Sequence, residues 1–227
     1  VHSIARIWVL PYAYMVKGSS PIKSLADFKG KRIYVKVKTN VSLLNANRAV
    51  LSTADLTEGD VKALDSGGVV AGINGVVEDR SDATTVAVGM PQLAKAHAST
   101  PGGIRIIPIG PKGTDEFIGK AMKGLRTVTV KPSKRLSYLK APIKVAAFDS
   151  YVNAGSTVTD TDAYLIAKAF HTNWKKLQKD YGPLRGVQAN QLAPATNVMP
   201  YHPGAIKYYK EAGVWTAAND KNEAQFK

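Results

Sequence analysis

Ile33-Tyr-Val-Lys-Val37 runs directly into Lys38-Thr-Asn-Val-Ser42, and these ten residues decide the fold class. The first five are rich in β-branched residues that alternate with other types, a pattern typical of a strand. Thr39 and Asn40 are residue types that cap helices, and the apolar residues after Val41 recur close to helical spacing. A strand followed at once by a helix predicts an α/β domain.

The same alternation of strands and helices extends over the rest of the chain. The capping box Thr159-x-x-Asp162 opens the clearest helix, which carries one continuous apolar face. Together these segments predict an α/β fold with a largely parallel sheet. Further strands are expected at 4–16, 84–88, 104–109, 128–130 and 143–148, and helices at 41–51, 92–98, 114–123, 159–177, 203–211 and 214–224.

Two segments give weaker patterns. Residues 69–77 predict a weak helix, interrupted by Gly72 and Gly75. Residues 56–61 predict a turn that leads into a short segment.

Composition limits the class of protein and of partner. The chain has 227 residues, and 31 Lys and Arg against 17 Asp and Glu give a net charge of +14. The absence of Cys excludes disulfide scaffolds and thiolate metal sites, and no apolar run reaches the ~18 residues that cross a bilayer. The charge favours an anionic partner such as nucleic acid, an acidic membrane surface or a carboxylate solute. A solvated lysine surface explains it equally well.

No catalytic or metal-binding motif is present in the sequence. No two of the four histidines have metal-ligand spacing, and there is no nucleophile elbow, phosphate loop or dinucleotide fingerprint. The acidic pairs Asp79/Asp82 and Asp160/Asp162 are interpreted as loop and helix-cap carboxylates. The sequence therefore predicts no catalytic residue, no metal and no cofactor.

Two strand-to-helix junctions are the candidate binding site. At residues 37–42, free backbone N–H groups and the positive end of a helix dipole face the same point, which suits an anion. Plain capping by Asn40 or Thr39 accounts for this pattern equally well. Gly89-Met90-Pro91 forms the second junction, and both fall at carboxyl ends of strands, where open α/β sheets bind ligands.

Three stretches together resemble a known family. Ile22–Val35 (IKSLADFKGKRIYV) is similar to a segment of type II periplasmic solute-binding proteins, and Asp162–Phe170 (DAYLIAKAF) is similar to a helix of the same group. Pro200–Trp215 (PYHPGAIKYYKEAGVW) resembles the C-terminal signature of the TAXI family, the solute receptors of TRAP transporters.

The resemblance implies a type II periplasmic-binding-protein-like fold, with two α/β lobes joined by crossover strands and a solute held in the cleft. Residues 26–139 would form the second lobe, and residues 1–25 and 140–227 the crossover and return parts of the first. Family members begin with a further segment that completes the first lobe, so we expect the first lobe to be incomplete here. Relatives carry a small Gly-Ser-Gly turn where this chain has Lys38–Ser42, which leaves open either a different solute or a relative that has lost its transport role.

The function implied is capture of a small anionic solute, an amino acid or a dicarboxylate, by hinge closure. The protein would act in the periplasm and pass the solute to a TRAP-type membrane permease. His202 and Glu211 are expected to hold the last helix onto the first lobe. The expected ligand-binding residues are Tyr12, Thr39, Asn40, Val41, Ser42, Gly89, Met90 and Tyr151.

Two other classes remain open at this point. An enzyme could use the same two-lobed scaffold, since fold does not dictate function. A basic interaction protein that contacts nucleic acid would fit the charge, although no recognised nucleic-acid motif accompanies the basic runs, and we expect no nucleic-acid partner.

Overall fold

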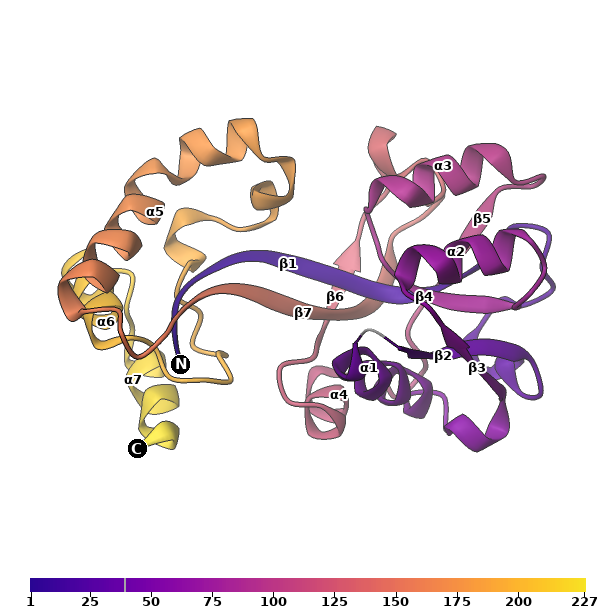
Figure 1. Cartoon of the computed structure of the whole chain (residues 1–227), viewed down its shortest axis with the longest axis horizontal. Helices are drawn as coiled ribbons and strands as arrows, with labels where there is room; N and C mark the ends of the chain where they lie inside the picture. Colours follow the sequence, from indigo (N-terminus) through magenta and orange to yellow (C-terminus); the bar gives the residue numbers. More distant parts are fainter. Residues whose placement is uncertain (39) are drawn as a thin grey trace. The chain divides into compact units, whose positions relative to one another are not determined.

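A computed structural model describes residues 1–38 and 40–227 of the chain, which divides into two compact units. Unit 1 comprises Val1–Val9 and Asp149–Lys227, and unit 2 comprises Leu10–Phe148. The chain leaves unit 1 within strand β1 (His2–Lys17) and returns to it within strand β7 (Ile143–Ala154), and the two strands are neighbours in the sheet (Figure 1). The lobe expected at 26–139 lies inside unit 2.

The sheet is mixed. Its order is β3-β2-β4-β1-β7-β6, and β5 also pairs with β1. Strand β2 is parallel to β3 and β4, whereas β1 is antiparallel to β4 and β5, and β6 is antiparallel to β7. The α/β class is confirmed, but the expectation of a largely parallel sheet is wrong. The remaining strands are β2 (Arg32–Val37), β3 (Lys62–Ser66), β4 (Ala83–Ala87), β5 (Ile104–Ile107) and β6 (Arg126–Val130).

Unit 2 has a core on each face of its sheet, because successive side chains of a strand point to opposite faces. Tyr12, Tyr14 and Val16 of β1 join one core, and Ala13 and Met15 join the other. The first core is covered by α1 (Val41–Ser52) and α4 (Asp115–Ala121), and the second by α2 (Val69–Val77) and α3 (Pro91–Ser99) (Figure 1).

Helix α2 is continuous through its glycines. A Cβ on Gly72 would overlap the Thr84 hydroxyl, and a Cβ on Gly75 would lie 2.5 Å from the Tyr34 hydroxyl. The glycines are therefore what lets α2 lie close against the sheet, and they do not interrupt it as the sequence pattern suggested.

Unit 1 is built on α5 (Asp160–Asp180), α6 (Pro203–Glu211) and α7 (Ala217–Glu223). The predicted cap of α5 is confirmed, since Thr159 Oγ1 accepts a hydrogen bond from the Asp162 N–H at 3.1 Å. Trp174 fills the core and donates from Nε1 to the Val187 carbonyl at 2.7 Å. Single 3₁₀ turns complete the chain at Leu25–Phe28, Glu58–Asp60, Lys134–Leu136, Gly182–Gly186, Ala189–Gln191 and Ala224–Phe226.

His202 and Glu211 have structural roles at the two ends of α6. His202 Nδ1 accepts from the Gly204 N–H at 3.3 Å and so caps α6, while its Nε2 lies 3.1 Å from the Val158 carbonyl. Glu211 accepts a 2.6 Å hydrogen bond from the Tyr164 hydroxyl of α5. These bonds fasten both ends of α6 within unit 1.

In the described part of the chain, none of the helices combines the length and the apolar character that a membrane span requires.

Candidate functional site

The carboxyl ends of β2 and β4 lie next to each other at one edge of the sheet. The two strands are parallel neighbours, with Ile33 opposite Ala83 and Tyr34 opposite Thr84. Helix α1 follows β2 and leads to β3 on one side, whereas α3 follows β4 and leads to β5, which pairs with β1 on the other side. The connections thus diverge between β2 and β4, and this topological switch point is where open α/β sheets bind ligands.

At the first junction, Asn40 caps α1. Its N–H donates to the Val37 carbonyl at 2.9 Å, and its Oδ1 accepts from the Leu43 N–H at 3.3 Å. The side chains of Asn40 and Ser42 are exposed, and α1 begins at Val41. Thr39, the other expected donor, lies outside the described residues. Capping by Asn40 therefore explains part of this pattern. Asn40 and Ser42 also present exposed polar side chains at this junction.

At the second junction, the backbone of Gly89 is already engaged within the protein. Gly89 has a φ of +105°, in the region that favours glycine. Its N–H donates to the Tyr138 hydroxyl at 3.1 Å, and its carbonyl accepts from Arg135 Nη2 at 3.1 Å. The Met90 N–H donates to the Ala87 carbonyl at 3.1 Å. The positive group next to this turn is therefore the exposed guanidinium of Arg135.

Tyr12 lies at the same sheet edge, opposite Ala87, with its ring in the core. Only 2% of Tyr12 is exposed, and the ring packs 5.7 Å from that of Phe148. Burial raises the pKa of Tyr12, so its hydroxyl remains a hydrogen-bond donor. That hydroxyl donates to Asn47 of α1, which gives Tyr12 a role in holding the helix that begins at the junction.

The structure thus gathers part of the expected site at one sheet edge. Asn40, Ser42, Gly89 and Met90 share that edge in unit 2, whereas Tyr151 is a half-buried residue of β7 in unit 1. Sequence reasoning missed Asn47, inside α1, and Arg135 and Tyr138, which come from a distant segment. The one signal that pointed to Arg135 was the basic cluster around it.

The positive charge is concentrated in unit 2. This unit contains 21 Lys and Arg against 10 Asp and Glu, whereas unit 1 contains 10 against 7. Residues 117–148 include eight basic residues and no acidic one. A field of this sign attracts anions. The eight are Lys120, Lys123, Arg126, Lys131, Lys134, Arg135, Lys140 and Lys144.

Over the described ranges 1–38 and 40–227, His, Asp and Glu side chains nowhere gather in a group of three that could hold a metal ion.

Several solved structures are similar to this chain. A putative L-cystine ABC transporter protein from Listeria monocytogenes has a TM-score of 0.45 at 14% identity, with 80% of this chain and 62% of that chain covered. An ancestral arginine-binding protein bound to arginine has a TM-score of 0.44 at 14% identity, with 78% and 62% covered. The periplasmic aliphatic sulphonate binding protein SsuA from Escherichia coli has a TM-score of 0.40 at 13% identity, with 97% and 68% covered.

This chain covers 62% of the length of both the Listeria and the ancestral proteins. The comparison with protein families gives a longer match, since the model described as the NMT1-like family matches residues 1–213 of the 227. The chain belongs to the NMT1-like family.

Proposed function

We propose that the protein is an extracytoplasmic solute-binding protein that captures a small carboxylate-bearing anion, an amino acid or a dicarboxylate, for a TRAP-type transporter. The proposal assigns it no catalytic residue and places its work in the periplasm. The binding residues it assigns to unit 2 lie at the two junctions, with Arg135 as an addition to the residues expected from the sequence.

The observation that carries the proposal is the switch point between β2 and β4. Two helices, α1 and α3, begin there on adjacent parallel strands, and each presents the positive end of its dipole. Exposed Asn40 and Ser42 offer neutral hydrogen-bonding groups at one junction, and Arg135 offers a permanent charge at the other. Positive dipole ends, polar side chains and a guanidinium together suit a carboxylate.

The transporter class rests on a different observation. The segment Pro200–Trp215 resembles the TAXI signature, and His202 and Glu211 within it hold α6 in place. Membership of the NMT1-like family is compatible with this assignment. Hinge closure around the solute stays a prediction from the resemblance.

A thermal-shift screen tests the proposal. The purified chain is heated with L-glutamate, succinate or L-arginine, each at up to 10 mM in a constant-ionic-strength buffer. We expect L-glutamate or succinate to raise the unfolding temperature and L-arginine to leave it unchanged. A ligand at about 100 times its Kd adds about 2.7 kcal/mol to the free energy of unfolding.

A second experiment tests the alternative that the protein binds nucleic acid. Binding of a fluorescent single-stranded oligonucleotide is measured over a rise in salt from about 50 to about 200 mM, in which phosphate contacts lose orders of magnitude in affinity. A tight oligonucleotide complex with this salt dependence, together with no shift from either carboxylate, would overturn the solute-binding proposal.

A further inference from the structure

Arg6 of β1 is a buried cation that is only partly satisfied. Its side chain is 10% exposed, and that of its partner Asp149 is 8% exposed; both belong to unit 1. The guanidinium donates from Nη1 to Asp149 Oδ2 at 3.2 Å. Among the described residues, Arg6 Nε is one of the buried side-chain nitrogen and oxygen atoms without any hydrogen-bond partner.

This arrangement is unusual for a structural arginine. A guanidinium has five N–H donors in a rigid plane, and hydrogen bonds between charged groups are normally about 2.7–2.9 Å long. A single 3.2 Å bond uses one donor weakly, and a buried donor without an acceptor is costly. The unused edge that contains Nε is a fork that fits the two oxygens of a carboxylate.

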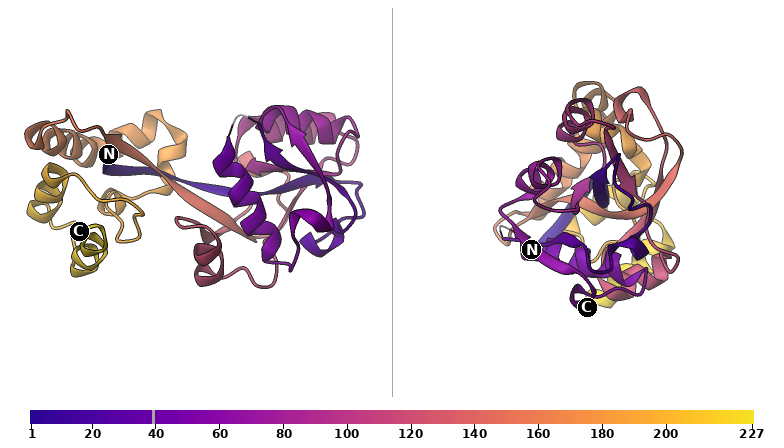
Figure 2. Two further views of the ribbon diagram at one scale, coloured as in Figure 1. Left: turned by 60° about the horizontal axis from the view of Figure 1, so that its bottom comes forward. Right: turned by 90° about the vertical axis from the view of Figure 1, so that its right-hand side faces the viewer.

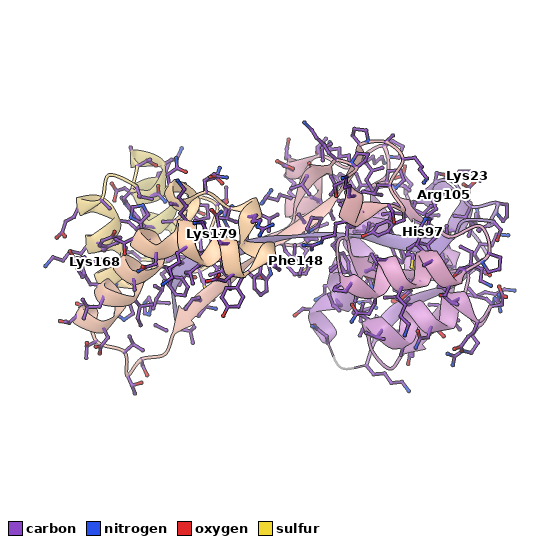
Figure 3. The ribbon with its side chains drawn as sticks, turned by 90° about the horizontal axis from the view of Figure 1, so that it is seen from above. Lys23, His97, Arg105, Phe148, Lys168 and Lys179 are labelled. Atoms are coloured by element: carbon purple, nitrogen blue, oxygen red, sulfur yellow. The ribbon has the colours of Figure 1, made fainter. Side chains whose placement is uncertain are left out.

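Arg105 of unit 2 shows what a structural arginine looks like in this protein (Figure 3). Its Nη1 donates to the carbonyls of Ser20 and Ile22 at 3.0 and 2.9 Å, and its Nη2 donates to the carbonyl of Gly18 at 2.6 Å. Backbone carbonyls thus accept from both of its Nη atoms, and it ties β5 to the loop after β1. By contrast, the buried Nε of Arg6 has no hydrogen-bond acceptor among the described residues.

A predicted ligand residue lies in the same neighbourhood. Tyr151 follows Asp149 by two residues in β7, and side chains two positions apart in a strand point to the same face. Tyr151 is the residue of unit 1 that the sequence nominated to cover a ligand.

We propose that Arg6 is an anion-binding residue whose Nε edge takes a carboxylate group, with Asp149 positioning the guanidinium. This inference rests on the proposed function, because it names a residue of unit 1 that takes a carboxylate group.

The direct test is a titration of the unsubstituted protein, followed by the ¹H–¹⁵N signals of its arginine Nε–H groups. Acetate and succinate are the probes, and sodium chloride at matched ionic strength is the control. Arg6→Lys and Arg105→Lys identify the two signals. We expect both carboxylates, but not chloride, to shift the Arg6 signal in a saturable way and to leave the Arg105 signal in place.

The outcomes separate this inference from the proposed function. If the backbone signals of Ser42 and Gly89 respond to succinate while the Arg6 signal stays fixed, the inference is wrong and the proposed function stands. If neither the junction signals nor the Arg6 signal responds to either carboxylate, both are wrong. Since the titration uses the unsubstituted protein, a folding defect in Arg6→Lys does not affect it.

The Arg6→Lys variant then measures how much the planar pair of donors contributes to succinate binding. Arg6→Lys keeps the charge but loses the planar pair of donors. We expect its Kd for succinate to rise at least tenfold while its circular dichroism spectrum stays unchanged. Arg105→Lys should leave the Kd within twofold, and an equal loss in both variants would contradict a specific role for Arg6.

Discussion

The Tyr12 hydroxyl donates a 2.6 Å hydrogen bond to Asn47 Oδ1, inside the core of unit 2. Asn47 in turn donates from Nδ2 to the Val35 carbonyl at 2.6 Å. These two bonds join β1, α1 and β2 below the junction at which the candidate site lies. The position of α1 at the switch point therefore depends on polar groups that are themselves buried.

We expect Tyr12→Phe to lower the free energy of unfolding by about 1–3 kcal/mol, because the buried Asn47 loses a partner for its Oδ1. Urea unfolding followed by circular dichroism measures the change. Tyr14→Phe is the matched control, since the Tyr14 hydroxyl is buried without a hydrogen-bond partner in the described part of the chain. Its removal should be neutral or stabilising, and equal losses in the two variants would contradict this account.

Asn40→Asp separates capping from anion binding. Asp caps a helix as well as Asn does, so we expect the free energy of unfolding to change by less than about 0.5 kcal/mol. Succinate binding should weaken about fivefold, because two like charges about 4 Å apart repel by about 1 kcal/mol even in water.

Isothermal titration with succinate measures this effect, and Asn45→Asp is its control. Asn45 is exposed on the same helix, inside α1 rather than at its cap. The same charge placed there should leave binding nearly unchanged. Unchanged binding in Asn40→Asp would remove this junction from the proposed site.

The charge of Glu58 makes the stability of the fold depend on pH in the acid range. Hydrogen bonds from Arg48, at 2.6 and 2.9 Å, hold the pKa of Glu58 below its ordinary value, and Lys36 adds a further ion pair at 3.3 Å. A carboxylate with a lowered pKa in the folded state stabilises the fold above its unfolded pKa, and this contribution is lost as the pH falls through the folded pKa.

Glu58→Gln should therefore be less stable than the unsubstituted protein near pH 7, by no more than about 1 kcal/mol. The difference should shrink as the pH falls from about 5 to about 2. Urea unfolding across this range measures it. Glu116→Gln, which removes an exposed pair with Lys120, should change stability by less than about 0.5 kcal/mol. A difference in unfolding free energy between Glu58→Gln and the unsubstituted protein that grows as the pH falls would contradict this role of Glu58.

Gly72→Ala tests the close approach of α2 to the sheet. The new methyl group would overlap the buried Thr84 hydroxyl, and we expect a loss of about 1–3 kcal/mol in unfolding experiments. Gly119→Ala in α4 has room, with the nearest atom 3.5 Å from the added Cβ, and should gain about 0.5–1 kcal/mol. A stabilising Gly72→Ala would show that α2 can move outward freely.

Local sequence patterns predicted the elements that have strong local signals. The strand at 33–37 and the capped helix after Thr159 appear where the patterns place them. Strand β3 was missed because it is an edge strand whose Lys62 and Asp65 break the alternation of apolar residues. The direction of β1 could not be predicted either, since a buried strand has the same pattern in parallel and antiparallel pairing.

The candidate site was predictable only where it is local. Junction residues such as Asn40 and Gly89 carry their own sequence signals. Tyr138 and Arg135 meet Gly89 across 49 and 46 residues of sequence, and no periodicity encodes such contacts. Arg6 has no sequence signal of its own within the strand expected at 4–16, because its unpaired nitrogen becomes evident only once Asp149 is brought beside it.

The course of β1 and β7 has a consequence for synthesis (Figure 2). Ser3 and Arg6 bond to Asn153 and Asp149, partners 150 and 143 positions later in the chain. The ribosome thus delivers all of Leu10–Phe148 before Val1–Val9 can contact residues 149–227. Domains fold as units while they emerge, so the nested segment can settle first. Ile4, Ile7 and Trp8 pack in the core of unit 1, and they gain their partners from residues 149–227 only after that stretch has been synthesised.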